Sequence, residues 1–272
     1  MLFIPGNTPN LLMNGDVLGA DSIILDLEDA VSPAEKDSAR ILVRNALKSL
    51  HYKGCEIIIR INPVETDYWM KDLDEIIPLK PNMIMPPKVS GAQDEKNTVK
   101  LIPLIETAMG VENAFQIASA DERVAAMFLG GEDLTADLRC KRTKEGNEIF
   151  YARTRLVCAA RACGIDVYDT PFTDVDDIEG LYADASFAKS LGFSGKASIS
   201  PRHVEGINEV FSPTQAEIDY AHEVMETIRI AKEQGKGVVS LRGKMIDAPI
   251  VERARQVIEM EKAMFGEVED DE

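Results

Sequence analysis

Short apolar runs alternate with longer amphipathic stretches along most of this chain, which is the pattern of successive strand–helix units. The apolar runs predict eight strands, at residues 2–4, 22–27, 56–61, 82–85, 101–105, 124–129, 165–168 and 195–199. Residues 33–50 and 147–162 have helical periodicity, whereas the stretch 89–99 is too short for a good helix. Eight strands with intervening helices favour an α/β fold of the (β/α)8 TIM barrel type over an open, doubly wound sheet.

The last sixty or so residues exceed what a barrel needs. Residues 215–232 and 250–263 predict two helices, and the sequence GVVSLRGKMIDAP between them predicts an ordered loop or a short strand. We therefore divide the chain into a barrel over residues 1–210 and a C-terminal helical extension over residues 211–272. The extension is expected to cap the barrel or to reach a neighbouring subunit.

Composition narrows the class of protein. The net charge of −17 argues against a nucleic acid partner, because phosphate binding needs a basic face. No apolar run approaches the roughly 20 residues that span a bilayer, and the N-terminus lacks the basic region of a signal peptide. The four cysteines have no CxxC spacing, so we expect reduced thiols in a cytoplasmic protein.

Charged and hydrogen-bonding residues follow almost every predicted strand, at the rim where barrel active sites form. These residues are Pro5-Gly6, Glu28-Asp29, Arg60 with Asn62, Lys88, Glu106, Glu132-Asp133, Asp169-Thr170 and Ser198 to Ser200. Carboxylates dominate, and carboxylates that converge on one mouth repel each other unless a cation is present. Oxygen ligands of this kind suit Mg²⁺, and no His or Cys cluster points to zinc.

Glu106 and Asp133 are the strongest metal-ligand candidates, because each follows a strongly apolar strand, LIPLI and VAAMFLGG respectively. An acidic residue there could instead interact with a helix N-terminus, and this alternative fits Glu132 well. His203 is the one histidine near the predicted rim, and we interpret it as structural.

Arg60 ends the strand sequence EIIIR. It could pair with Glu28 or Asp29, or it could bind a substrate carboxylate in the bidentate geometry of a guanidinium group, which we prefer. Lys88 and Lys196 raise a rival chemistry, since Schiff-base aldolases also place a lysine on a barrel strand. That mechanism needs a desolvated amine with a lowered pKa.

A set of motifs that spans nearly the whole chain resembles one enzyme family. The motifs are MLFIPGNTP, LDLEDAV followed by EKDSAR, IIIRIN, LIETAMGV, LGGEDLTADLR, GIDVYDTPF and GVVSLRGKMIDAPIVERAR. Together they resemble the citrate lyase β subunits, in a family that includes malyl-CoA and citramalyl-CoA lyases and malate-synthase-like proteins. The resemblance implies a (β/α)8 barrel, typically trimeric, that makes or breaks a bond between an acyl thioester and an α-keto acid.

The resemblance also implies roles for particular residues. Glu106 and Asp133 match the Mg²⁺ ligands, and Arg60 matches the arginine that contacts the keto acid and the thioester carbonyl. Asp247 in GKMIDAP matches an acidic residue supplied by a neighbouring subunit, which we expect to protonate the enolate carbon.

Four further residues match the substrate-binding part of the family's pocket. Glu28 and Asp29 match an acidic pair, with Asp29 linked to the metal through water. Gly131 and Glu132 complete the set, and the backbone from Gly131 to Asp133 is expected to help hold the keto acid's carboxylate at a helix N-terminus. The sequence Ile199-Ser200-Pro201-Arg202 replaces the IHP of stand-alone CoA lyases and favours the citrate lyase form.

These matches predict a Mg²⁺-dependent lyase that cleaves a citryl thioester, carried on CoA or on an acyl carrier protein, to oxaloacetate and an acetyl thioester. They predict citrate lyase α and γ (acyl carrier) subunits as partners, and a homotrimer in the cytoplasm. A stand-alone citramalyl-CoA or malyl-CoA lyase is the leading alternative. A non-catalytic interaction subunit is less favoured, because four separated polar groups are intact.

Overall fold

The structure, a computed structural model, describes residues 1–91, 99–234 and 239–265. It divides into two compact units, Met1–Phe211 and Ser212–Glu272. Residues 92–98 of the short stretch after the fourth predicted strand lie outside the described residues, as do residues 237–238 of the GVVSLRGKMIDAP segment.

The first unit is a ring of parallel strands, which confirms the predicted barrel. Its strands are β1 (Leu2–Pro5), β2 (Ser22–Asp26), β3 (Glu56–Arg60), β4 (Met83–Met85), β5 (Lys100–Leu101), β6 (Leu104–Ile105), β7 (Ala126–Leu129), β8 (Asp166–Asp169) and β9 (Gly195–Lys196). Pairing runs in sequence order from β1 to β5 and again from β6 to β9. The ring closes where the Phe3 amide donates to the Ser198 carbonyl at 2.9 Å and the Ser198 amide donates to the Met1 carbonyl at 3.0 Å.

The fifth predicted strand is divided into β5 and β6 by Ile102 and Pro103. Proline has no amide hydrogen, so the regular ladder is interrupted there. The chain nevertheless stays in the ring, because the Ile102 amide donates to the Ile84 carbonyl and the Phe128 amide donates to the Pro103 carbonyl, both at 3.0 Å. The two short strands β5 and β6 therefore occupy one of the eight strand positions of the barrel.

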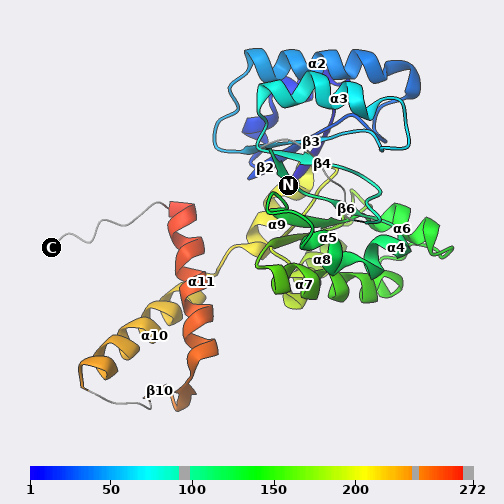
Figure 1. The fold of residues 1–272 in the computed structure, drawn as a ribbon. Helices are drawn as coiled ribbons and strands as arrows, with labels where there is room; N and C mark the ends of the chain where they lie inside the picture. The colour runs from blue at the N-terminus through cyan, green and yellow to red at the C-terminus, as the bar shows by residue number, and fades with distance from the viewer. Residues whose placement is uncertain (92–98, 235–238, 266–272) are drawn as a thin grey trace. The chain divides into compact units, whose positions relative to one another are not determined.

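Helices follow the strands and cover the outside of the ring (Figure 1). The α-helices of this unit are α1 (Pro9–Met13), α2 (Lys36–Ser49), α3 (Trp69–Ile76), α4 (Ala108–Glu112), α5 (Ala114–Ala118), α6 (Gly131–Asp137), α7 (Phe150–Cys163), α8 (Ile178–Leu191) and α9 (Val204–Phe211). Short 3-10 helices lie at Gly15–Leu18, Pro33–Glu35, Ile77–Leu79, Asn147–Ile149 and Pro201–His203. The two helices predicted at 33–50 and 147–162 are confirmed, each beginning with one 3-10 turn.

Side-chain alternation along the strands decides which residues face the interior. Ile23 and Leu25 of β2 pack outward in a cluster with residues of α2, while Ile24 belongs to the interior cluster with Ile58 of β3. Successive strand residues point to opposite sides. Asp26 and Arg60, two residues further along β2 and β3, therefore also point inward, where the barrel opens.

The second unit is a helical hairpin with a small sheet. Its elements are α10 (Gln215–Glu233), the antiparallel strands β10 (Val239–Leu241) and β11 (Lys244–Ile246), and α11 (Ala248–Phe265). Both predicted helices are confirmed, and the segment between them forms a two-stranded hairpin. Asp247 lies on the exposed surface and caps α11, since the Ile250 amide donates to its Oδ1 at 3.1 Å. In the described part of the chain, no helix combines the length and the apolar character needed to cross a membrane.

Candidate active site

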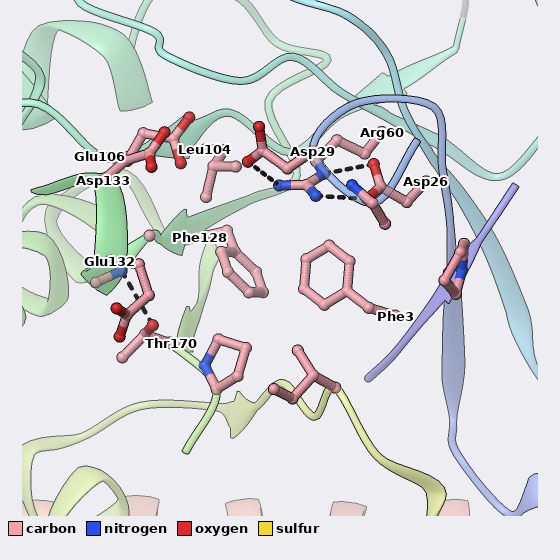
Figure 2. A pocket seen from close by; sticks show the side chains of 16 residues that line it. Phe3, Asp26, Asp29, Arg60, Leu104, Glu106, Phe128, Glu132, Asp133 and Thr170 are labelled. Atoms are coloured by element: carbon pink, nitrogen blue, oxygen red, sulfur yellow. Dashed lines mark hydrogen bonds and ion pairs between the residues drawn. The ribbon is translucent and has the colours of Figure 1, made fainter. Parts of the chain in front are cut away.

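A cavity of about 370 Å³ opens at the carboxyl ends of the barrel strands. The residues that line it are Phe3, Pro5, Asp26, Asp29, Ala30, Arg60, Leu104, Glu106, Phe128, Gly130, Gly131, Glu132, Asp133, Thr170, Pro171 and Ile199. Arg60 with its acidic partners lies on one side of the cavity, Glu106 and Asp133 lie on another, and the rings of Phe3 and Phe128 lie between them (Figure 2). The pocket therefore combines a charged rim with an apolar wall.

Arg60 is held by the carboxylate of the neighbouring strand. Arg60 and Asp26 are register partners in β3 and β2, and Nε and Nη2 of Arg60 donate to Oδ1 and Oδ2 of Asp26 at 2.7 and 2.5 Å. Its Nη1 lies 3.1 Å from Oε2 of Glu28 and 3.6 Å from Oδ2 of Asp29. The guanidinium also lies over the ring of Phe3, 5.0 Å from its centroid. The sequence predicts Glu28 or Asp29 as possible acidic partners of Arg60, and both lie near its Nη1, but the partner with two hydrogen bonds is Asp26, which is not among the predicted residues.

Glu106 is a buried carboxylate aimed into the cavity. The Lys88 amide donates to its Oε1 at 2.8 Å, and only 3% of the residue is exposed. Burial, and then the charges of Glu28 and Asp133, raise the pKa of Glu106 to about 8. A carboxylate in this environment is stabilised in its charged form only when a cation is close. Glu106 and Asp133 thus form a hard oxygen donor pair of the kind that Mg²⁺ prefers.

The fit to a metal ion depends on this pair. Across the described residues, no group of three or more His, Cys, Asp and Glu side chains is gathered as a metal site. Magnesium does not require such a group, because it usually takes one or two carboxylates and completes its octahedral shell with substrate and water. Two carboxylates at an open cavity suit an ion that must also bind substrate oxygens.

Lys88 is the second cation of the site. Its Nζ donates to Oε1 of Glu28 at 2.6 Å and lies 3.2 Å from Oδ2 of Asp133. Burial works to lower the pKa of Lys88, but the hydrogen bond to Glu28 and the surrounding carboxylates raise the pKa above its ordinary value. Lys88 is therefore an ammonium group, which argues against the Schiff-base alternative. Lys196 is fully buried in a separate ion cluster, with Asp169 and Asp184 each at 2.6 Å.

Helix α6 brings its first residues to the edge of the cavity. The Gly131 amide donates to Oγ1 of Thr170 at 3.0 Å, which ties α6 to the end of β8. The side chain of Glu132 is 61% exposed and lies 3.6 Å from Nε of Arg142, whereas Asp133 faces Lys88. Gly131 and Glu132 line the cavity, and their predicted contact with a substrate carboxylate stays a prediction.

The remaining wall of the cavity is apolar. Phe3 and Phe128 meet edge to face, with their ring centroids 5.8 Å apart, and Leu104, Pro171 and Ile199 extend the same wall. Apart from Ile199, which belongs to the predicted rim, the sequence does not single out these residues, because Phe3, Leu104 and Phe128 lie in apolar strand runs that are typical of barrel core. Their place at the carboxyl ends of strands was the signal that could have identified them.

Most of the predicted site residues belong to this one region. Arg60, Asp29, Glu106, Glu132 and Asp133 line the cavity. Glu28 lies behind them, buried against Arg60 and Lys88. Asp247 belongs to the second unit, so its role stays a prediction.

A parallel barrel whose strand ends carry an acidic pocket with one lining arginine has the architecture of a TIM-barrel enzyme. The chain belongs to the HpcH/HpaI aldolase/citrate lyase family, whose sequence profile matches residues 1–201. This establishes a carbon–carbon lyase and confirms the resemblance seen in the motifs.

Curated relatives cover nearly the full chain. The citrate lyase subunit beta of Leuconostoc mesenteroides subsp. cremoris is 40% identical over 280 residues, covering 97% of this chain and 93% of that protein. A (3S)-malyl-CoA thioesterase of Cereibacter sphaeroides is 34% identical over 274 residues, covering 98% and 96%. The family therefore contains relatives with different thioester substrates in their names.

Solved structures agree with the fold. CitE of Mycobacterium tuberculosis, in complex with magnesium, acetoacetate and coenzyme A, superimposes with a TM-score of 0.81 at 28% identity, covering 95% of this chain and 96% of that one. The citrate lyase beta subunit of M. tuberculosis complexed with oxaloacetate and magnesium gives a TM-score of 0.71 at 30% identity, covering 78% and 96%.

Proposed function

We propose that this protein is a Mg²⁺-dependent lyase that cleaves a citryl thioester to oxaloacetate and an acetyl thioester. The observation that carries the proposal is the pair Glu106 and Asp133 facing Arg60 across one cavity at the strand ends (Figure 2). The citrate lyase β relatives and the neighbours that bind magnesium with oxaloacetate or acetoacetate support it.

Glu106 and Asp133 hold the metal ion in this proposal. A magnesium ion bound there supplies Lewis-acid polarisation to the substrate's hydroxyl and carboxylate oxygens. The raised pKa of Glu106 fits this role, because a carboxylate that is poorly solvated by water gains most from a nearby cation.

Arg60 binds the part of the substrate where negative charge develops. A base takes the proton of the tertiary hydroxyl as the carbon–carbon bond breaks, and the bonding electrons pass to the departing thioester as an enolate whose negative charge lies largely on the thioester oxygen. Asp26 occupies one edge of the guanidinium, so substrate approaches Nη1, where Asp29 is a loose partner at 3.6 Å with a 58% exposed side chain. Displacing Asp29 lets Arg60 stabilise the enolate oxygen as an oxyanion-hole donor.

Asp247 donates the proton that converts the enolate into the acetyl group. It comes from the C-terminal extension, residues 211–272, which in this proposal completes the active site of a neighbouring subunit in a homotrimer. The predicted partners are citrate lyase α and γ subunits, with the thioester carried on the acyl carrier γ subunit or on CoA. The citrate lyase relatives, which are named as subunits, support this assembly.

A second candidate is a stand-alone lyase for citramalyl-CoA or malyl-CoA. Arg60 is the one basic side chain among the described residues that line the cavity, and Phe3, Leu104 and Phe128 make part of the wall apolar. One basic side chain matches the single free carboxylate of malyl and citramalyl thioesters, and this match is the reason to keep the second candidate. The malyl-CoA thioesterase relative points the same way.

The test follows oxo-acid release by purified protein supplied with Mg²⁺ and, in turn, citryl-CoA, citramalyl-CoA and malyl-CoA. Oxaloacetate formation that stops with EDTA supports the first candidate, and release of pyruvate or glyoxylate alone supports the second. Replacement Asp133→Ala should abolish turnover, while Glu122→Ala, an exposed acid before the same strand β7, should leave it unchanged. An active, chelator-resistant Asp133→Ala protein would refute the metal assignment.

A further inference from the structure

Lys88 contacts three acidic residues that come from three different strand ends. Its amide nitrogen donates to Oε1 of Glu106, and its Nζ lies between Oε1 of Glu28 and Oδ2 of Asp133 at 2.6 and 3.2 Å. Its backbone has a φ of +56°, in the left-handed region that L residues rarely adopt. One residue thus holds the acidic side of the pocket with both its main chain and its side chain.

The position of the ammonium group has a direct consequence for metal binding. Asp133 is one of the two carboxylates assigned to the metal ion, and Lys88 already neutralises it. A divalent ion and an ammonium group repel each other, and both seek the same carboxylate oxygens. The two cations therefore compete for Asp133, even though Glu28 can remain bound to Lys88.

We propose that Lys88 is a positioning residue that acts as a built-in counter-cation, competing with the divalent ion for Asp133 and retaining Glu28 when the ion is bound. The inference rests on the proposed function, because it takes Glu106 and Asp133 as the metal ligands. Lys88 releases Asp133 as the ion binds and swings fully onto Glu28. Metal affinity is thereby kept lower than the carboxylates alone would give.

The surroundings of Glu28 explain why Lys88 remains in the site. The Glu28 side chain is only 4% exposed, and its Oε2 makes no hydrogen bond, although it lies 3.1 Å from Nη1 of Arg60. Without Lys88, Arg60 would be the one remaining ion-pair partner of this buried carboxylate among the described residues. Arg60 would then be drawn away from the substrate, so the lysine is expected to matter for turnover as well as for metal affinity.

Mn²⁺ binding measured by electron paramagnetic resonance separates these effects. Lys88→Met should bind Mn²⁺ at least about threefold more tightly than wild type, because a like charge has been removed from the site, and its kcat should fall. Lys88→Arg should restore wild-type affinity. Lys80→Met is the matched control, since Lys80 is exposed, has a φ of +53° and precedes β4, whereas Lys88 follows it.

The outcomes distinguish this inference from the proposed function. If wild-type protein binds no Mn²⁺, the metal assignment itself is wrong. If wild type binds Mn²⁺ but Lys88→Met binds it equally or more weakly, only the competition is refuted. Should Lys88→Met fail to fold, the side-chain resonance of Lys88 in wild type decides, because Mg²⁺ must shift it and leave that of Lys80 unchanged.

Discussion

At the scale of single residues, the arginine of the pocket is fixed by a carboxylate whose oxygens are already engaged in hydrogen bonds. Asp26 accepts two hydrogen bonds from Arg60 and one each from the amides of Glu28 and Ala30. Four donors on one buried carboxylate leave it little capacity for a further ligand. Asp26 is thus a positioning residue, and Arg60 is the group that meets the substrate.

Replacement Asp26→Asn tests this division of roles. The amide keeps the shape but removes the charge and turns an NH₂ group toward the buried guanidinium. We expect unfolding in urea to show a loss of about 3 kcal/mol, and kcat/KM to fall on the order of 100-fold because Arg60 is misplaced. Asp29→Asn should change the free energy of unfolding by less than about 1 kcal/mol, because the Asp29 side chain is exposed and lies further from Arg60 than Asp26 does. Equal stability of the two variants would contradict the role of Asp26.

At the scale of elements, the junction between β7 and α6 depends on a glycine. A Cβ atom at Gly130 would lie 2.6 Å from Oε2 and 2.7 Å from Cβ of Glu106. Because Gly130 has no side chain, Glu106, which follows the neighbouring strand β6, can pack directly against the start of α6. This close approach sets the position of one predicted metal ligand.

Gly130→Ala should therefore damage the metal site and the fold together. Overpacking of this kind costs about 1–3 kcal/mol, which urea unfolding will measure, and the displaced Glu106 carboxylate should weaken Mn²⁺ binding. Gly91→Ala is the matched control, since a Cβ there meets nothing within 4 Å. Unchanged Mn²⁺ affinity in Gly130→Ala would indicate that Glu106 is free to move without loss of the ion.

At the scale of elements, the strand ends and the residues that follow them could be predicted from the sequence, whereas contacts between separate strands could not. Most strand ends are predicted to within one residue, because apolar runs stop where polar residues begin, and this located Arg60, Glu106 and Asp133 at the cavity. The strand predicted at 195–199 is the exception, since β9 ends at Lys196. Asp26 was missed because it lies within the strand, although alternation after Ile24 places it inside the barrel. Lys88 was weighed only as a nucleophile, since its contacts with Glu28 and Asp133 depend on how separate strands close into a ring.

At the scale of the whole molecule, the proposed chemistry is divided between two compact units. Arg60 and the metal ligands belong to the barrel, and Asp247 belongs to the helical hairpin of residues 212–272. Asp247 is fixed at the N-terminus of α11, because its side chain accepts from the Ile250 amide and its carbonyl accepts from the Val251 amide. These contacts hold the exposed carboxylate at the start of α11.

Complementation between two inactive variants tests whether Asp247 of one subunit completes the active site of a neighbouring subunit. Arg60→Met and Asp247→Asn should each lose turnover, while Mn²⁺ binding is retained. After unfolding and joint refolding in equal amounts, about a quarter of the sites in a cyclic oligomer combine an intact Arg60 with an intact Asp247 from the neighbour. Activity should return to that fraction if the site is shared. If each subunit uses its own Asp247, no mixed assembly contains a complete site, and the mixture stays inactive however long the subunits exchange.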